Sequence, residues 1–253
     1  MNAKTDLYLK EMGLGPRWRL RTPVLAALEP EVSVNAEPQS DAATIAQAAP
    51  ESRAAPADNR RIAIQGMDWS TLCSDIRTCN ACPLSSTRTQ AVPGVGAERA
   101  DWLFVGEAPG ADEDAQGEPF VGQAGKLLDA MLAAIGLKRG DNVYIANVLK
   151  CRPPGNRNPA AEEVMRCEPY LLRQVELIQP KLIVALGKFA AQTLLAQDAP
   201  IAKLRGSVHR YQGIPMVVTY HPAYLLRTLT DKAKAWQDLC LAVKTMREVE
   251  QAG

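Results

Sequence analysis

Apolar runs that alternate with segments of helical periodicity constrain the fold of this chain more than any other sequence feature. Buried strands are predicted at 102–105, 143–148, 182–186 and 216–219. Helical spacing of apolar residues is found at 124–135, at 160–178, from 188 onward and near the C-terminus. This order predicts an α/β fold: a three-layer sandwich in which helices cover both faces of a central, mainly parallel, four-stranded sheet.

Individual residues set the expected ends of the helices. Asp68 is predicted to cap a helix that ends at Cys79, and Gly136 to stop the helix over 124–135. Pro169 is expected to kink or split the helix over 160–178, because proline removes a backbone hydrogen bond and its ring crowds the preceding turn.

The first 67 residues differ in composition from the rest. Residues 1–22 form a short apolar-basic segment, which either binds a protein partner or is a terminus without function. Residues 23–67 are rich in Ala and Pro, with no Lys or Arg between Arg21 and Arg53. Such a segment buries too little apolar surface to offset its ordering entropy. We therefore expect a disordered N-terminal extension with a flexible linker over 23–67, followed by one folded domain over 68–250.

Charge and hydropathy exclude several classes of protein. The formal net charge is only +1, so binding of nucleic acid would depend on local basic patches. No apolar run approaches the ~18–20 residues needed to span a bilayer, and Lys10 and Glu11 interrupt the apolar start that a signal peptide would need. We expect a cytoplasmic monomer without a membrane partner. In that reducing compartment, six cysteines favour metal ligation or burial over disulfides.

Four of the cysteines form two groups. Cys79 and Cys82 are close enough in sequence to bind one metal centre, whereas Cys151 follows the second strand and Cys167 lies on the next helix. The four could ligate zinc or an iron–sulfur cluster. Zinc ribbons usually have two tight pairs, so the wide second spacing favours a cluster; plain burial of four small residues is the alternative.

Polar side chains follow three of the predicted strands. Glu107 follows the first strand, Asn147 lies at the end of the second, and His221 follows the fourth. In parallel sheets the ligand crevice lies outside the carboxyl ends of the strands. The sequence therefore predicts that these three side chains meet in one site.

Four motifs in order identify a family. They are Gly106–Gly110 with Glu113-Asp114, then Pro119–Gly122, Asn147–Pro154 and His221–Arg227. Together with the four cysteines, they resemble the iron–sulfur (family 4) uracil-DNA glycosylases over roughly residues 68–247. The resemblance implies a DNA-repair hydrolase of base excision repair that cleaves the N-glycosidic bond of deoxyuridine in single- and double-stranded DNA, leaving an abasic site. It also implies a 4Fe-4S cluster held by Cys79, Cys82, Cys151 and Cys167.

The resemblance assigns roles in base recognition and leaving-group stabilisation. Phe120 would be the platform on which the extruded base stacks, and Asn147 would read the edge of uracil while mismatching cytosine. His221 would donate a hydrogen bond to uracil O2 as the glycosidic bond breaks. Ordinary structural roles, such as backbone contacts for Asn147 and turn capping for His221, are the alternatives.

The resemblance also assigns roles to further residues of the motifs. Glu107 would position the attacking water or stabilise an oxocarbenium-like sugar, since Ala108 stands where better-studied relatives have an aspartate general base. The Ala108 and Gly110 N–H groups would bind uracil O2, and Glu113 would exclude the methyl group of thymine.

The segment after His221 is expected to contact DNA. Leu225 and Leu226 are expected to be exposed on a loop, and Leu225 matches the position that intercalates into the base stack. Arg227 would clamp a flanking phosphate. Local positive charge near the crevice is expected from Lys150, Arg152, Arg157, Lys203, Arg205 and Arg210.

Three alternative functions stay open at this point. The first is a single-turnover or non-catalytic uracil-DNA-binding protein of the same superfamily; the absence of histidine from residues 150–157 favours turnover. The second is a nucleotide-binding α/β protein, which the Gly106 loop does not favour, because it lacks the spacing and the lysine of a phosphate-binding loop. The third is a zinc-stabilised interaction module.

Overall fold

A computed structural model of the chain describes residues 56–252. The predicted segment 1–22 and most of the predicted linker therefore lie outside the described residues. Helix α2 (Pro56–Gln65) occupies part of the range expected to be linker, so the boundary at residue 67 is wrong. Its Ile64 is buried beside Leu72 and Ile76, and the Arg60 guanidinium lies 4.8 Å from the centre of the Tyr170 ring. These contacts stabilise a helix that composition alone did not predict.

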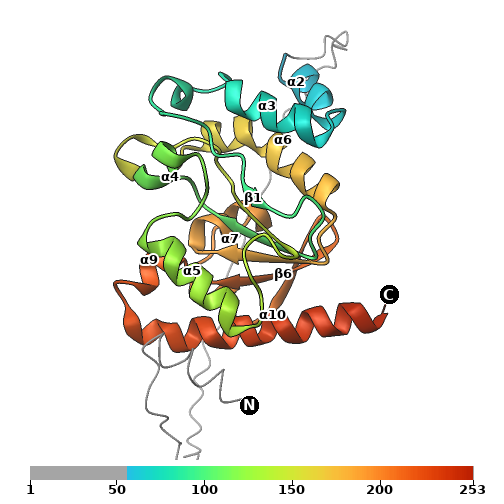
Figure 1. Cartoon of the computed structure of the whole chain (residues 1–253), viewed down its shortest axis with the longest axis vertical. Helices are drawn as coiled ribbons and strands as arrows, with labels where there is room; N and C mark the ends of the chain where they lie inside the picture. Colours follow the sequence, from blue (N-terminus) through green and yellow to red (C-terminus); the bar gives the residue numbers. More distant parts are fainter. Residues whose placement is uncertain (1–55, 253) are drawn as a thin grey trace, which may run out of the picture.

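The central sheet has six strands in the order β1-β3-β2-β4-β6-β5 (Figure 1). The four predicted strands are present and pair in parallel as β3-β2-β4-β6. The strands are β1 (Val95–Gly96), β2 (Trp102–Gly106), β3 (Val143–Asn147), β4 (Leu182–Leu186), β5 (Val208–Tyr211) and β6 (Ile214–Thr219). The sheet is thus mixed and mostly parallel, and the expected count of four strands is corrected to six.

Both additional strands are antiparallel edges. In β5 the side chains alternate between exposed and half-buried, so the strand lacks the apolar run that marks the central strands. It joins β6 through a two-residue turn at Gln212 and Gly213, both with positive φ. His209, expected in a loop, lies in β5, where its Nε2 is 2.6 Å from the carbonyl oxygen of Leu204.

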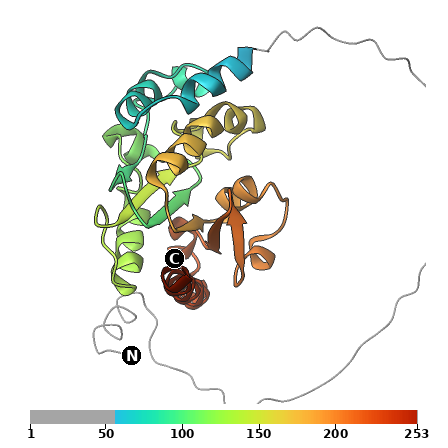
Figure 2. The ribbon, with the colours of Figure 1, turned by 90° about the vertical axis from the view of Figure 1, so that its right-hand side faces the viewer.

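Helices cover both faces of the sheet, which confirms the three layers (Figures 1 and 2). Helices α5 and α10 pack on one face through Leu128, Leu132 and Met246. Helices α6 and α7 pack on the other through Leu171, Val175 and neighbouring alanines. The helices that pack on the sheet are α5 (Gln123–Ala134), α6 (Ala161–Ile178), α7 (Lys188–Leu195) and α10 (Lys232–Ala252).

Shorter elements complete the domain. They are α3 (Trp69–Thr78), η1 (Pro83–Ser86), α4 (Ala111–Gln116), η2 (Pro154–Asn156), α8 (Ile201–Leu204), α9 (Pro222–Leu225) and η3 (Leu229–Asp231). As predicted, Asp68 caps α3 by accepting the Thr71 N–H at 2.8 Å. Within the described residues, no helix combines the length and the apolar character that crossing a bilayer requires.

Helix α6 is continuous across Pro169, so the expectation that this proline splits it is wrong. The helix carries a buried stripe that includes Cys167, Tyr170, Leu171 and Val175. Burial of this stripe outweighs the backbone hydrogen bond that proline cannot donate. The continuity matters for the site, because α6 connects the cysteine region to the face of the sheet behind β3.

Candidate functional site

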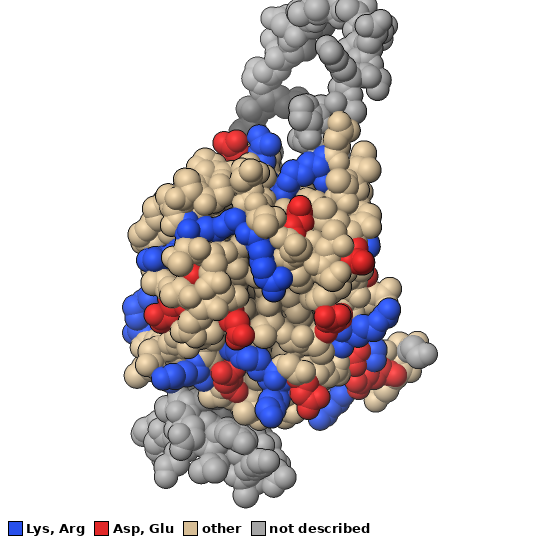
Figure 3. Space-filling view, turned by 45° about the horizontal axis from the view of Figure 1, so that its top comes forward, with Lys and Arg blue, Asp and Glu red and all other residues tan. Residues whose placement is uncertain are grey.

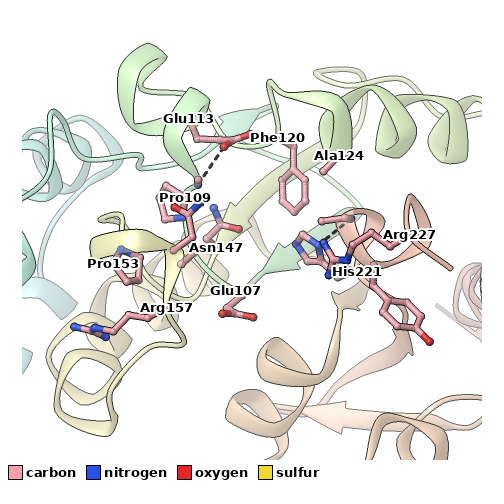
Figure 4. Close-up of a pocket in the computed structure, with 15 residues that line it drawn as sticks. Glu107, Pro109, Glu113, Phe120, Ala124, Asn147, Pro153, Arg157, His221 and Arg227 are labelled. Carbon is pink, nitrogen blue, oxygen red and sulfur yellow. Dashed lines mark hydrogen bonds between the residues drawn. The ribbon is translucent and has the colours of Figure 1, made fainter.

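The carboxyl ends of β2, β3 and β6 open into a cavity of about 470 Å³. Its position is a switch point of the sheet, because β3 and β4 lie on opposite sides of β2. Figure 4 shows Glu107, Phe120, Asn147 and His221 directed into this one hollow from separate elements. The predicted meeting of carboxylate, amide and imidazole is therefore present. The other lining residues are Ala108, Pro109, Gly110, Glu113, Ala124, Pro153, Asn156, Arg157, Ala223, Tyr224 and Arg227.

Asn147 is the last residue of β3, and its side chain is the most informative group in the cavity. The residue is 2% exposed, and its Oδ1 has no hydrogen-bond partner among the described residues. A Cβ on Gly106 would lie 2.4 Å from that oxygen and 2.6 Å from Cζ of Phe120, so only glycine lets the strand approach both. An unpaired buried acceptor costs about 1–3 kcal/mol. The site thus holds an acceptor that suits a ligand N–H.

His221 precedes α9 and has a defined tautomer. The Ala223 N–H donates to His221 Nδ1 at 3.2 Å, so in the neutral ring the proton is on Nε2. Burial lowers the pKa of His221 to about 4; Glu113 opposes this shift and Arg227 adds to it. The imidazole is therefore neutral at neutral pH and offers one N–H donor. Turn capping, considered above as an alternative role, occurs through Nδ1 and leaves Nε2 free.

Glu107 lies just beyond β2, and its backbone oxygen accepts the Leu149 N–H at 3.0 Å. This bond extends the pairing of β2 with β3 and fixes the residue at the cavity wall. Burial raises the pKa of its carboxyl group above the ordinary 4.5. A carboxylate in this environment is more basic than one in water.

Phe120 lies in a tight loop and faces His221. Its ring centre is 5.4 Å from that of the imidazole, at an interplanar angle of 31°. Its backbone has φ 56°, a left-handed conformation that is uncommon for a bulky residue. The aromatic ring therefore forms one wall of the cavity through a conformation that neighbouring groups must hold.

Glu113 holds that loop through backbone hydrogen bonds. Its Oε1 accepts the N–H groups of Val121 and Gly122 at 3.0 and 3.3 Å, and its Oε2 accepts that of Gly110 at 3.1 Å. The Gly110 N–H, which was expected to bind uracil O2, therefore already donates to Glu113. Contact of Glu113 with the C5 position of a pyrimidine stays a prediction.

The expectation that Leu225 is exposed is wrong. Leu225 ends α9 and is fully buried against α5 and α10, beside Met131 and Leu239. The next residue, Leu226, is 43% exposed. Arg227 lines the cavity and is exposed, as a phosphate contact requires.

The four predicted ligand cysteines line a second, smaller cavity. Cys79 ends α3, Cys82 precedes η1, Cys151 follows β3, and Cys167 lies on α6; none of the four forms a disulfide in the described part of the chain. N–H groups point at three of the sulfur atoms: Arg88 Nη1 to Cys151 at 2.8 Å, the Lys150 backbone N to Cys167 at 3.3 Å, and Arg60 Nη2 to Cys79 at 3.8 Å. Four cysteines that line one cavity, three of them with an N–H donor at the sulfur atom, suit an anionic cluster of thiolates.

Lys150 connects this cavity to the larger one, which was not predicted from the sequence. It is 1% exposed, so it is not one of the surface charges on which a DNA phosphate could rest. Its Nζ donates to the Asn147 carbonyl oxygen at 2.8 Å and to Gln174 Oε1 at 2.6 Å. Burial lowers the pKa of Lys150 to about 8. No motif indicated Gln174, which lies on α6 and becomes a partner only through the fold.

Comparisons with known proteins agree with this geometry. The family model of the uracil DNA glycosylase superfamily matches residues 93–240, more than half of the chain. A type-4 uracil-DNA glycosylase of Archaeoglobus fulgidus is 52% identical over 160 residues, which cover 60% of this chain and 80% of the relative. One from Pyrobaculum aerophilum is 43% identical over 183 residues, covering 69% and 93%. A type-5 uracil-DNA glycosylase of Pyrobaculum aerophilum is 35% identical over 150 residues, covering 53% and 66%.

The class is defined by an α/β sheet whose carboxyl edge holds a cavity lined by a carboxylate, an amide and an imidazole, with a four-cysteine cavity nearby. The chain belongs to the uracil DNA glycosylase superfamily and, within it, to the type-4 uracil-DNA glycosylases. The family predicted from the four motifs is confirmed.

Proposed function

We propose that Asn147, His221 and Glu107 carry out the glycosylase reaction of this chain, which hydrolyses the N-glycosidic bond of deoxyuridine in DNA. The products are free uracil and an abasic site. The observation that carries the proposal is the buried, unpaired Oδ1 of Asn147 in the same cavity as the free Nε2 of His221. One group matches the base edge, and the other matches the charge that develops on the leaving base.

Base recognition follows from the donor and acceptor pattern of the Asn147 amide. Uracil presents an N3–H donor to Oδ1 and an O4 acceptor to the amide NH₂ group at Nδ2. Cytosine presents an acceptor at N3 and a donor at N4, so both contacts become repulsive. Because the amide is buried, a mismatched base leaves it without water as a substitute partner. Phe120 would stack on the face of the same base, a contact worth about 1–3 kcal/mol.

Bond cleavage places the electron pair of the C1′–N1 bond on uracil, which leaves as an anion. The Nε2–H of neutral His221 would donate to O2 and stabilise that charge without transferring its proton. Water adds to C1′ and loses a proton, which completes the hydrolysis. The Glu107 carboxylate would orient this water or stabilise positive charge on the sugar, and burial raises its pKa in the direction that aids proton acceptance.

Cys79, Cys82, Cys151 and Cys167 would hold the 4Fe-4S cluster that the type-4 family implies. When bound, the cluster joins α3, the segment after β3 and α6, which is a structural contribution. Cys167→Ala is expected to lose visible absorbance, iron and sulfide together, and the free energy of unfolding should fall by several kcal/mol. Cys240→Ala removes an exposed cysteine and is the control. It should change neither the content of iron and sulfide nor the free energy of unfolding. Zinc without sulfide in the purified protein would contradict the cluster.

The DNA would cross the mouth of the cavity beside Leu226 and Arg227. Figure 3 shows a run of Lys and Arg across the upper part of one face, with Asp and Glu near it and further residues of both signs mixed in the lower part. The charge is thus local, which agrees with a net charge of +1. Phosphate contacts of this kind make the affinity fall with salt.

Leu226 would fill the gap that the extruded nucleotide leaves in the base stack. Leu226→Ala should lower kcat/KM on duplex DNA about tenfold, since unstacking a base step costs a few kcal/mol. Single-stranded DNA has no stack to refill, so its kcat/KM should stay near that of the unmodified protein. Leu229→Ala removes another exposed leucine nearby, 60% exposed against 43% for Leu226, and is the control. Equal losses on both substrates would exclude the wedge.

Repeated turnover is tested with a molar excess of end-labelled uracil oligonucleotide, single-stranded or duplex, without added metal or nucleotide. Alkaline scission of the abasic product should give many product molecules per protein molecule. A yield at or below the amount of protein would support the alternative, a single-turnover or non-catalytic uracil-DNA-binding protein. Persistent complexes in a denaturing gel would separate covalent capture from slow release.

A further inference from the structure

A guanidinium outside all four sequence motifs fixes the backbone of Phe120. Arg139 lies in the loop between α5 and β3. Its Nη1 donates to the Pro119 carbonyl oxygen at 2.8 Å, and its Nη2 donates to that of Phe120 at 2.9 Å. The same side chain donates from Nε to Asp129 Oδ1 at 3.0 Å. One planar group therefore binds two successive carbonyls and is itself oriented by a carboxylate.

The hydrogen bonds from Arg139 hold the backbone at a residue whose conformation is energetically unfavourable. Phe120 has φ 56°, and aromatic residues rarely adopt this left-handed conformation without support. A Cβ on Gly125 would lie 1.7 Å from the Phe120 carbonyl oxygen, so α5 leaves room for that oxygen only because glycine stands there. The carbonyls on one side of the loop bind Arg139, while the N–H groups that follow bind Glu113.

The ring of Phe120 is positioned by this backbone. It lies so close to Gly106 that an added Cβ there would be 2.6 Å from its Cζ, and its centre is 5.4 Å from that of the His221 ring. If φ of Phe120 relaxed to an ordinary negative value, the ring would leave that wall. Arg139 itself does not line the cavity. Its effect on a bound base would therefore be transmitted through Phe120.

We propose that Arg139 is a positioning residue for the aromatic platform, held by Asp129 and acting on catalysis only through Phe120. The inference rests on the proposed stacking role of Phe120. The new element is that a side chain almost twenty positions away in the sequence determines the conformation of Phe120.

The test is a double-mutant cycle between Arg139→Gln and Phe120→Ala, measured as kcat/KM on uracil-containing single-stranded DNA. Arg139→Gln alone should lower kcat/KM about tenfold, within the range expected for a lost base stack. The loss should fall on kcat, because KM depends mainly on phosphate contacts that the variant retains. In the Phe120→Ala background, Arg139→Gln should cause less than a twofold further loss.

Arg173→Gln is the matched control. Arg173 is as buried as Arg139, with 20% and 22% of the side chain exposed. It likewise binds a backbone oxygen, that of Met67 at 2.8 Å, and a carboxylate, that of Glu176 at 3.0 Å. Its replacement should lower the melting temperature to a similar extent and leave kcat/KM within twofold.

The outcomes separate the inference from the proposal beneath it. If Phe120→Ala does not change kcat/KM, the stacking role fails, and the inference fails with it. If Phe120→Ala impairs the reaction but Arg139→Gln does not, or if the two losses multiply, only the inference is overturned. Should Arg139→Gln not fold, Arg139→Lys and Asp129→Asn replace it in the cycle. Each keeps part of the network, and each should give a smaller loss that again disappears in the Phe120→Ala background.

Discussion

Asn147→Asp should change which base the enzyme releases. The carboxylate keeps an acceptor for a ligand N–H but loses the Nδ2 donor that matches uracil O4. Excision of uracil should fall about 10²–10³-fold. Cytosine should become a measurable substrate, because its N4 amine can donate to the new oxygen and the protonated form of the carboxyl group can donate to its N3. Sites built around buried hydrogen bonds reject the wrong ligand by about 10⁴–10⁵. The ratio of uracil to cytosine excision is therefore the quantity to measure.

A control at the other end of the same strand separates recognition from stability. Asn142 directly precedes β3, and its amide oxygen accepts the Asp101 N–H at 2.7 Å, away from the cavity. Asn142→Asp should lower the melting temperature, because the new charge faces the Asp101 carboxylate 3.0 Å from the present amide. It should leave the base ratio unchanged. If Asn147→Asp also leaves the ratio of uracil to cytosine excision unchanged, Asn147 does not recognise the base.

The central strands and the three site residues could be predicted because each depends on a local signal. Strands β2 and β4 are uniformly buried apolar runs, and the rule that ligands bind at the carboxyl edge of a parallel sheet then placed Glu107, Asn147 and His221 together. Strand β5 was missed because half of its side chains face solvent, as is usual for an edge. The turn at Gln212 and Gly213 was the available signal for it.

Other features depend on contacts that no short segment encodes. Leu225 and Leu226 are neighbours of the same type, and only the packing of α9 against α5 and α10 decides which one is buried. Lys150 is preceded and followed by motif residues, yet its burial requires Gln174 from α6 as a partner. Arg139 belongs to an ordinary polar loop until the fold brings it to the carbonyl oxygen of Phe120. Each of these is decided by tertiary contacts.

His221→Ala should lower kcat by about 10²–10³-fold, the usual effect of removing one donor to a developing oxyanion. The variant also removes the acceptor for the Ala223 N–H, and loss of such a cap costs about 0.5–2 kcal/mol of stability. His221→Ala therefore changes activity and stability together, and two further variants are needed to separate the two effects.

His221→Asn retains an oxygen that can accept the Ala223 N–H but provides no donor at the position of Nε2. It should be nearly as stable as the unmodified protein and nearly as inactive as His221→Ala. His221→Gln extends an amide towards the Nε2 position and should recover part of kcat. If His221→Asn were fully active, the imidazole would be only a cap, and leaving-group stabilisation would have to come from another group.

The pH profile gives an independent test of the neutral imidazole. Because burial lowers the pKa of His221 to about 4, its ring should be mostly neutral from pH 5 to 8. The Glu107 carboxyl, whose pKa burial raises above 4.5, should instead be protonated as the pH falls, and the rate should decline with it. Glu107→Gln should remove this acid limb, whereas His221→Gln should retain it. An acid limb that disappears in His221→Gln and persists in Glu107→Gln would mean that the imidazole titrates during catalysis, and that the neutral-donor mechanism is wrong.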